Sequence, residues 1–412
     1  MKIEIRLLAL ACAALPWGVR AQTLAVTHVT VIDVENGRAL ADRTVVAEGP
    51  RIAAVAPAAR ARVPRGARIV DGRGRFLIPG LWDMHVHMFG VLPPSAEDPA
   101  ARTYFLPAFL AHGITGVRSM FDDLGAIRRL REAEPGFEVL SSGPVLDGDP
   151  PYFQGFIGCK TPEQARAAVQ RVKREGGDFL KVYSLLSREA YFAIVDEAAK
   201  QGLRIAGHLP NSVTAAEASD AGQRSFEHLM GVPNDPALFA RFVRNGTWQT
   251  PTLVALRAPA FAGDPAFEND PRVAGLPEAI RQYWKMQMAE MQHWGKDAAD
   301  RRARFGEQFR TVAAMRRAGV KILAGSDTPN PYVFPGVSLH EELSLLVEAG
   351  LTPAEALRAA TLRPAEFLGR LDRAGSIAPG KNADMVLLDG NPLADIANTR
   401  RIAAVILKGR VR

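Results

Sequence analysis

The sequence predicts an α/β fold, a (β/α)8 TIM-like barrel with a small composite β-sandwich domain formed by the two ends of the chain. Eight short β-rich runs recur through the middle, and most are followed by a helical pattern. Alternating runs rich in Val, Thr and Ile occur at both ends, broken by turn signals such as Asn-Gly. No Gly-rich nucleotide fingerprint follows the first run, which weighs against the alternative of an open, doubly wound sheet. We therefore assign residues 22–79 and 376–412 to the sandwich and residues 80–375 to the barrel.

Residues 1–21 have the pattern of a secretory signal peptide. The segment has a short charged start, an apolar stretch from Leu7 to Leu15 and a Val-Arg-Ala end. The apolar stretch is too short to span a bilayer as a helix. A buried N-terminal helix and a lipoprotein signal at Cys12 are the alternatives. We expect an exported protein, periplasmic or secreted, which keeps Cys159 as its single cysteine and needs no disulfide.

Composition is that of an ordinary globular protein. Apolar residues make up 47% and charged residues 23% of the chain, which is enough for a full core. No segment after residue 21 is apolar enough to cross a membrane. The formal net charge is +7, but basic residues occur in several segments and no nucleic-acid-binding motif accompanies them. We expect a small-molecule partner and no nucleic acid, and the sequence leaves the oligomeric state open.

The eight runs are the expected barrel strands, in chain order. The helix that follows the third run has the clearest pattern, because Ala165, Ala168, Val169 and Val172 share one face. A Thr-Pro-Glu start and a Gly-Gly stop bound this helix. The runs are LIPGLWDMH (77–85), ITGVRSM (114–120), FEVLSSG (137–143), DFLKVYS (178–184), RIAGHL (204–209), RSFEHLM (224–230), WQTPTL (248–253) and KILAGSD (321–327).

Residues 254–319 form an unusually long connection after the seventh run. The pattern predicts two or three helices, which contain Tyr283, Trp284 and Trp294 and several Met residues. Loops that follow the strands build the site of such a barrel. The connection is therefore either a lid over the site or extra packing on the barrel wall.

Polar residues cluster at the ends of the predicted strands, and the carboxyl ends of barrel strands meet at one face. His85 and His87 lie two residues apart, so both side chains project to the same side and can bind one ion. Neutral imidazole is the commonest metal ligand in proteins, and Zn²⁺ accepts nitrogen and carboxylate oxygen. The candidate ligands are His85 and His87 at the end of the first run, Lys181 in the fourth, His208 in the fifth, His228 in the sixth and Asp327 in the eighth.

Each of the remaining candidates has a chemical role. Asp327 can bind a metal and accept a proton from water whose pKa the metal lowers from about 15.7 towards 7. Lys181 as an ammonium has no lone pair, so it either neutralises carboxylates, forms a barrel ion pair, or reacts with carbon dioxide to give a carbamate that bridges two metals. Arg118 and Tyr183 either hold a substrate carboxylate or carbonyl or pack in the barrel.

The motifs around these residues resemble the metal-dependent amidohydrolase superfamily, within it the imidazolonepropionase-like and prolidase-like branch. The resemblance covers nearly all of the chain after residue 21. It rests on LIPGLWDMHVH, GITGVRSM, DFLKVYS, AGHLP, FEHL, AGSDT, GLTPAEALRAAT and GSIAPGKNADMVLLDGNPL.

The resemblance implies a site for two divalent metal ions, with Zn²⁺ as the expected metal. Asp327 would take the proton from a bridging hydroxide and pass it to the leaving amine. The implied ligands are His85, His87 and Asp327 for the first ion, His208 and His228 for the second, and carboxylated Lys181 as the bridge.

The resemblance also implies the activity, an exported metal-dependent amidohydrolase that cleaves amide bonds of dipeptides or N-acyl amino acids. Hydrolysis of a cyclic amide, lactone or ester is the alternative within enzymes, since the same nucleophile attacks all of them. A non-catalytic ligand-binding barrel is the alternative from a different class. The clustered His, Lys and Asp side chains argue against that second alternative, because burying them without a metal would cost free energy.

Overall fold

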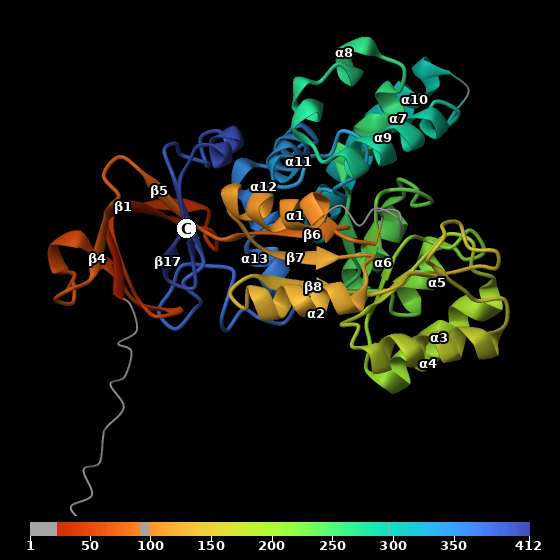
Figure 1. Ribbon diagram of the computed structural model, residues 1–412, viewed down its shortest axis with the longest axis horizontal. Coiled ribbons are helices and arrows are strands. Elements are labelled where there is room, and N and C mark those ends of the chain that lie inside the picture. Colours follow the sequence, from red (N-terminus) through yellow and green to blue (C-terminus); the bar gives the residue numbers. More distant parts are fainter. Residues whose placement is uncertain (1–22, 91–98, 296) are drawn as a thin grey trace, which may run out of the picture.

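A barrel and a smaller β-sheet domain make up the part of the chain described by the computed structural model, residues 23–90, 99–295 and 297–412 (Figure 1). The signal peptide predicted for residues 1–21 lies outside these ranges. The fold is the predicted (β/α)8 barrel type with an additional β-sheet domain. Within the described ranges, no helix is both long and apolar enough to cross a membrane.

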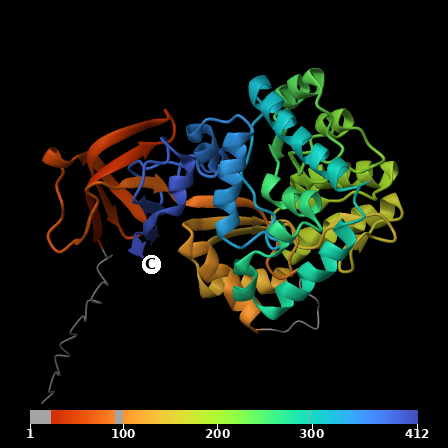
Figure 2. The same cartoon turned by 90° about the horizontal axis from the view of Figure 1, so that it is seen from above.

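Strands from both ends of the chain form one eight-stranded sheet. They are β1 (Thr23–Asp33), β2 (Arg38–Glu48), β3 (Arg51–Pro57), β4 (Arg68–Asp71), β5 (Phe76–Pro79), β15 (Met385–Leu388), β16 (Ile402–Leu407) and β17 (Arg410–Val411). β5 pairs with β1 on one side and antiparallel with β15 on the other, so the C-terminal strands continue the N-terminal ones. Figure 2 shows the blue C-terminal strands beside the red N-terminal ones. Apolar residues from both ends, including Val26, Leu77 and Leu387, share one core.

The barrel strands follow the predicted order. They are β6 (Leu81–Val86), β7 (Ile114–Ser119), β8 (Glu138–Ser141), β9 (Leu146–Asp147), β11 (Leu180–Val182), β12 (Ile205–Gly207), β13 (Ser225–Glu227) and β14 (Trp248–Thr250), with β10 (Ile157–Gly158) beside β9. They form two parallel sheets, β6–β7–β8 and β10–β9–β11–β12–β13–β14, and among the described residues no strand pairing joins β8 to β9. The sequence missed β9 and β10, which are only two residues long.

Two of the predicted runs differ from the observed strands. The first run divides at Gly80, so that its start lies in the sheet domain and its end in the barrel. The eighth run is not a regular strand: it closes the barrel through single parallel bridges, Gln249 with Ile322 and Val86 with Thr328. At Asp327, the last residue of the run, the φ of 66° takes the backbone out of the extended conformation.

Helices cover the outside of the barrel strands. The predicted helix is α3: its N-cap Thr161 accepts a hydrogen bond from the Gln164 N–H, it ends at Gly176 with φ of 93°, and its four predicted apolar residues are buried. The helices are α1 (Pro99–Ala111), α2 (Leu124–Ala133), α3 (Pro162–Glu175), α4 (Arg188–Gln201), α5 (Ala215–Asp220), α6 (Pro236–Asn245), α11 (Val337–Glu348), α12 (Pro353–Ala359) and α13 (Leu362–Phe367), with 3-10 turns η1 (Ala58–Arg60), η2 (Pro271–Gly275) and η3 (Ile396–Arg400).

The long connection after β14 is helical, as predicted. Its helices form the upper right part of Figure 1, and α7 packs against α10 and α11. The helices are α7 (Leu253–Phe261), α8 (Pro265–Glu268), α9 (Glu278–Met291) and α10 (Ala298–Ala318).

A buried carboxyl group in α11 predicts a pH-dependent stability. Glu342 is fully buried, its Oε2 accepts a hydrogen bond from the Val254 N–H at 2.8 Å, and its Oε1 has no partner among the described residues. Burial raises the pKa of Glu342 from 4.5 to about 8. The folded state therefore keeps a proton that the unfolded state releases, and stability falls as pH rises from about 4.5 to 8, by about 1.4 kcal/mol per unit at most.

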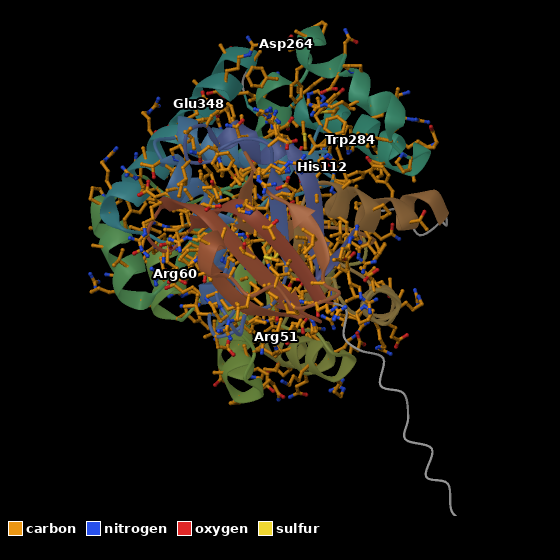
Figure 3. The ribbon with its side chains drawn as sticks, turned by 90° about the vertical axis from the view of Figure 1, so that its left-hand side faces the viewer. Arg51, Arg60, His112, Asp264, Trp284 and Glu348 are labelled. Atoms are coloured by element: carbon orange, nitrogen blue, oxygen red, sulfur yellow. The ribbon has the colours of Figure 1, made fainter. Side chains whose placement is uncertain are left out.

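Urea unfolding at several pH values would measure this slope. We expect Glu342→Gln to remove the Glu342 contribution and to be more stable than the wild type above pH 8. The matched control is Glu348→Gln, at an exposed position of the same helix (Figure 3), which should keep the wild-type slope. An unchanged slope in Glu342→Gln would show that this carboxyl group does not carry the effect.

Candidate metal centre

The two histidines of the first run end β6 on the same side of the strand, as predicted. His85 is fully buried, and the intervening residues Met84, Val86 and Met88 are buried in the core. Both imidazoles reach Asp327: the distance from Nε2 to Oδ1 is 3.3 Å for His85 and 3.0 Å for His87.

His208 and His228, the residues that directly follow β12 and β13, extend this group of imidazoles. The ring centroid of His228 lies 4.8 Å from that of His85 and 4.8 Å from that of His208. His228 Nδ1 is 3.6 Å from Asp327 Oδ2. Candidate ligand atoms of His85, His228 and Asp327 all lie within 4.8 Å of one another, close enough to share one metal ion.

Lys181 lies on β11 beside this group and is 1% exposed. Burial lowers the pKa of Lys181 to about 8, although the carboxylates of Glu227 and Asp327 oppose the shift. A lower pKa increases the fraction of neutral amine near neutral pH. The neutral amine is the form that can react with carbon dioxide.

Three of the four imidazoles are fixed through Nδ1. The partner is Glu227 Oε2 for His85 at 2.9 Å, Ser184 Oγ for His208 at 3.0 Å and Thr252 Oγ1 for His228 at 2.7 Å. Such partners orient a ligating histidine and leave its Nε2 lone pair available. Burial lowers the pKa of all three imidazoles and thereby favours their neutral, ligating form.

Unpaired buried atoms indicate that this group is built for a metal ion. His85 Nε2, His87 Nδ1 and Asp327 Oδ1 are buried and lack a hydrogen-bond partner among the described residues. Burial alone would raise the pKa of Asp327, but His228, His87 and Lys181 hold it below its usual range, so that the carboxylate is ionised. Nitrogen and carboxylate donors of this kind fit a divalent ion such as Zn²⁺.

The sequence analysis missed Glu227 and Asp83, which position the ligands. Glu227 is buried and accepts from His85 and from Arg118 Nη2 at 2.8 Å. Asp83 accepts from the Ser326 N–H at 2.8 Å and from its hydroxyl at 2.6 Å, which fixes the residue before Asp327. The alternation along β6 could have identified Asp83, because it lies two residues before His85. For Glu227 the sequence offered one signal only, its position directly before the candidate ligand His228.

Arg118 is held inside the barrel, which is the second of its two predicted interpretations. It is 1% exposed, and its guanidinium donates to Met84 O at 2.6 Å, to Ser225 Oγ at 3.0 Å and to Glu227. These contacts use the guanidinium inside the barrel, so the alternative of barrel packing is the one that the structure supports.

Tyr183 lies beside the metal-ligand candidates and remains a candidate for substrate contact. Its ring stacks on His208 with centroids 3.9 Å apart and an angle of 27°. The rings of Tyr152, Phe153 and Phe156 also lie near the Tyr183 ring, with centroids 5.1 to 6.2 Å away. The four rings form one aromatic wall next to His208.

Helix α9 of the long connection contacts two loops near the site. Trp284 Nε1 donates to Pro329 O at 2.6 Å, two residues after Asp327. Tyr283 OH donates to Asn330 Oδ1 at 3.3 Å, and Tyr152 OH to Glu290 Oε1 at 3.1 Å. These contacts favour the lid interpretation of the connection over packing on the barrel wall alone.

Comparisons with known proteins agree on the kind of fold and chemistry. A family model described as "Amidohydrolase family" matches residues 76–412. Ochratoxinase from Aspergillus niger is 27% identical over 284 residues, which cover 64% of this chain and 52% of that protein. A structure from Bifidobacterium longum assigned as a prolidase superposes with a TM-score of 0.76 at 27% identity and covers 95% of both chains. A prolidase solved with N-methylphosphonate-L-proline has a TM-score of 0.75 at 25% identity, covering 95% of this chain and 99% of the other.

Proposed function

The chain belongs to the amidohydrolase family, a family of hydrolases acting on carbon–nitrogen bonds, and we propose that it cleaves the amide bond of dipeptides or N-acyl amino acids in a metal-dependent reaction. The observation that carries this proposal is the convergence of His85, His87 and His228 on the ionised Asp327, with His208 beside His228. The likeness to two prolidase structures, one solved with a proline analogue, supports the choice of substrate class.

The residues present offer nitrogen and carboxylate donors of the kind that divalent metal ions accept. In this proposal two ions would be held: His85, His87 and Asp327 would bind the first, His208 and His228 the second, and Lys181, if carboxylated, would be a ligand of both. Bound ions of this kind lower the pKa of water and polarise a carbonyl group.

Side chains of this protein transfer the proton and hold the imidazoles in position. Asp327 is ionised, and its Oδ1 has no hydrogen-bond partner among the described residues, so it can accept the proton of the attacking water and deliver it to the leaving amine. Glu227, Ser184 and Thr252 hold three imidazoles in place throughout. Tyr183 and its aromatic neighbours line one side of the site.

Removing metal tests the metal dependence. We expect treatment with a chelator to lower amidase activity by about 100-fold or more, and Zn²⁺ to restore it, because the imidazoles alone are weak activators of water. Metal analysis of the untreated protein should give about two ions per chain, and circular dichroism should show the stripped protein still folded. Full activity in metal-free protein would contradict the proposal.

A substrate panel tests the bond that is cleaved. Dipeptides, including those with C-terminal proline, and N-acyl amino acids are expected to be hydrolysed faster than lactones and cyclic amides of similar size. The reverse order would favour the ring-opening alternative. No metal-dependent turnover on either set would favour the non-catalytic alternative.

We also propose that the protein is exported, on the basis of the signal-peptide pattern in residues 1–21. Expression with and without this segment, followed by cell fractionation, tests the location. Export should depend on the segment, and N-terminal sequencing of the exported protein should begin at Gln22.

A further inference from the structure

The excess positive charge of the chain is concentrated in one segment of the sheet domain. The formal net charge is +7, and residues 1–21 carry +2 of it. Residues 58–75 contain six arginines and one aspartate, and this segment therefore supplies the remaining net charge of +5. Basic residues occur all along the chain, but over the other residues their total equals that of the acidic ones.

Four of these arginines have no compensating charge. Arg60, Arg62, Arg65 and Arg68 are exposed, and their side chains make no hydrogen bond or ion pair with the part of the chain that the structure describes. The other two arginines differ, because one pairs with Asp71 and one with Asp389.

Apolar side chains are exposed among these arginines. Val63 is 38% exposed and Ile69 is 54% exposed. We call the six side chains from η1 to β4 the basic edge: Arg60, Arg62, Val63, Arg65, Arg68 and Ile69. Figure 3 looks onto this end of the molecule and labels Arg60.

The basic edge lies on the sheet domain, away from the carboxyl ends of the barrel strands that carry the candidate metal centre. A single residue, Gly80, separates β5 of the sheet domain from β6 of the barrel, so the sheet domain adjoins the amino end of β6. His85 and His87 lie at the carboxyl end of that strand. Figure 1 shows β4 at the far left and the barrel strands running away from it. A partner bound at the basic edge would leave the site accessible.

We propose that the basic edge binds the surface of an anionic phospholipid bilayer. Phosphate headgroups attract arginines that lack a protein partner, and each basic residue near such a surface contributes to binding. Exposed Val63 and Ile69 can enter the interface between headgroups and acyl chains. Nucleic acid is less well matched, because residues 51–75 contain no aromatic side chain on which a base could stack.

Co-sedimentation of the full chain with vesicles tests the proposal. The protein should bind vesicles of phosphatidylcholine with phosphatidylglycerol more tightly than vesicles of phosphatidylcholine alone, and salt should weaken the binding. Replacing the four arginines of the basic edge by Gln should reduce the affinity by about tenfold or more. Amidase activity and thermal stability should stay at wild-type values.

A control variant with the same loss of charge separates the basic edge from net charge. It carries four Gln substitutions at exposed basic residues elsewhere, Arg128, Arg244, Lys285 and Arg317. This variant should keep wild-type vesicle binding. An equal loss in both variants would overturn the proposal, and so would equal binding of the wild type to both kinds of vesicle.

Substitution of the apolar pair separates a lipid surface from other polyanions. Val63→Thr with Ile69→Thr keeps β-branched shapes but removes apolar contact, and it should weaken vesicle binding by about threefold or more. If this double variant binds vesicles like the wild type while the wild type binds a DNA duplex as tightly as it binds vesicles, the surface is a polyanion site and the lipid proposal is wrong.

Discussion

Replacing Asp327 by Asn is expected to lower kcat/KM for the amide substrate by about 1,000-fold or more. The Asn side chain keeps the shape of the carboxylate but has no negative charge and cannot accept a proton. Asp327 also approaches His85, His87 and His228, so its charge holds the centre together. Bound metal, measured by elemental analysis, should fall below the wild-type content.

The matched control for this substitution is Asp372→Asn, at an exposed position in a loop after α13. It should retain wild-type kcat/KM and metal content. A circular dichroism spectrum and a Tm for each variant will show whether the fold is kept. If Asp327→Asn retains wild-type turnover in a folded protein, Asp327 does not carry the proton.

Breaking the buried pair of Arg118 and Glu227 is expected to have the largest effect on stability. Both side chains have almost no exposed surface, and Arg118 Nη2 lies 2.8 Å from each carboxylate oxygen of Glu227. Arg118→Met and Glu227→Gln each leave one buried charge without its partner, which typically costs about 3–5 kcal/mol. Urea unfolding should show these losses in the free energy of unfolding.

The double variant Arg118→Met/Glu227→Gln tests the coupling. It should lose less than the sum of the two single variants, because neither charge then remains buried alone. Strictly additive losses would mean that the pair does not act as a unit.

The two single variants should differ in metal binding. Glu227 also accepts from His85 Nδ1, so Glu227→Gln should weaken metal affinity by about 10–100-fold. Arg118→Met leaves this contact in place and should weaken affinity less. Equal metal affinities in the two variants would contradict the orienting role of Glu227.

Much of the site could be predicted because its residues lie on short periodic runs. The alternation in LWDMHVHM placed His85 and His87 on one side and Met84 and Val86 on the other, and the structure confirms both. The rule that barrel strands converge at their carboxyl ends brought residues from distant runs together. The same rule does not say how far a side chain on a strand reaches. The sequence therefore left two interpretations of Arg118 open, and only the structure shows its guanidinium used within the barrel.

The sequence by itself determined the kinds of donor, their order along the chain and the strands that carry them, since residue type and a two-residue period are local properties. Only the tertiary structure decided which imidazole nitrogen is held and which is left for a metal. The reason is that Glu227, Ser184 and Thr252 are each distant in sequence from the histidine that they hold. It also decided the backbone at the centre: His228 and Asp327 have φ of 63° and 66°. Non-glycine residues rarely adopt such angles, and the surrounding packing must hold them there.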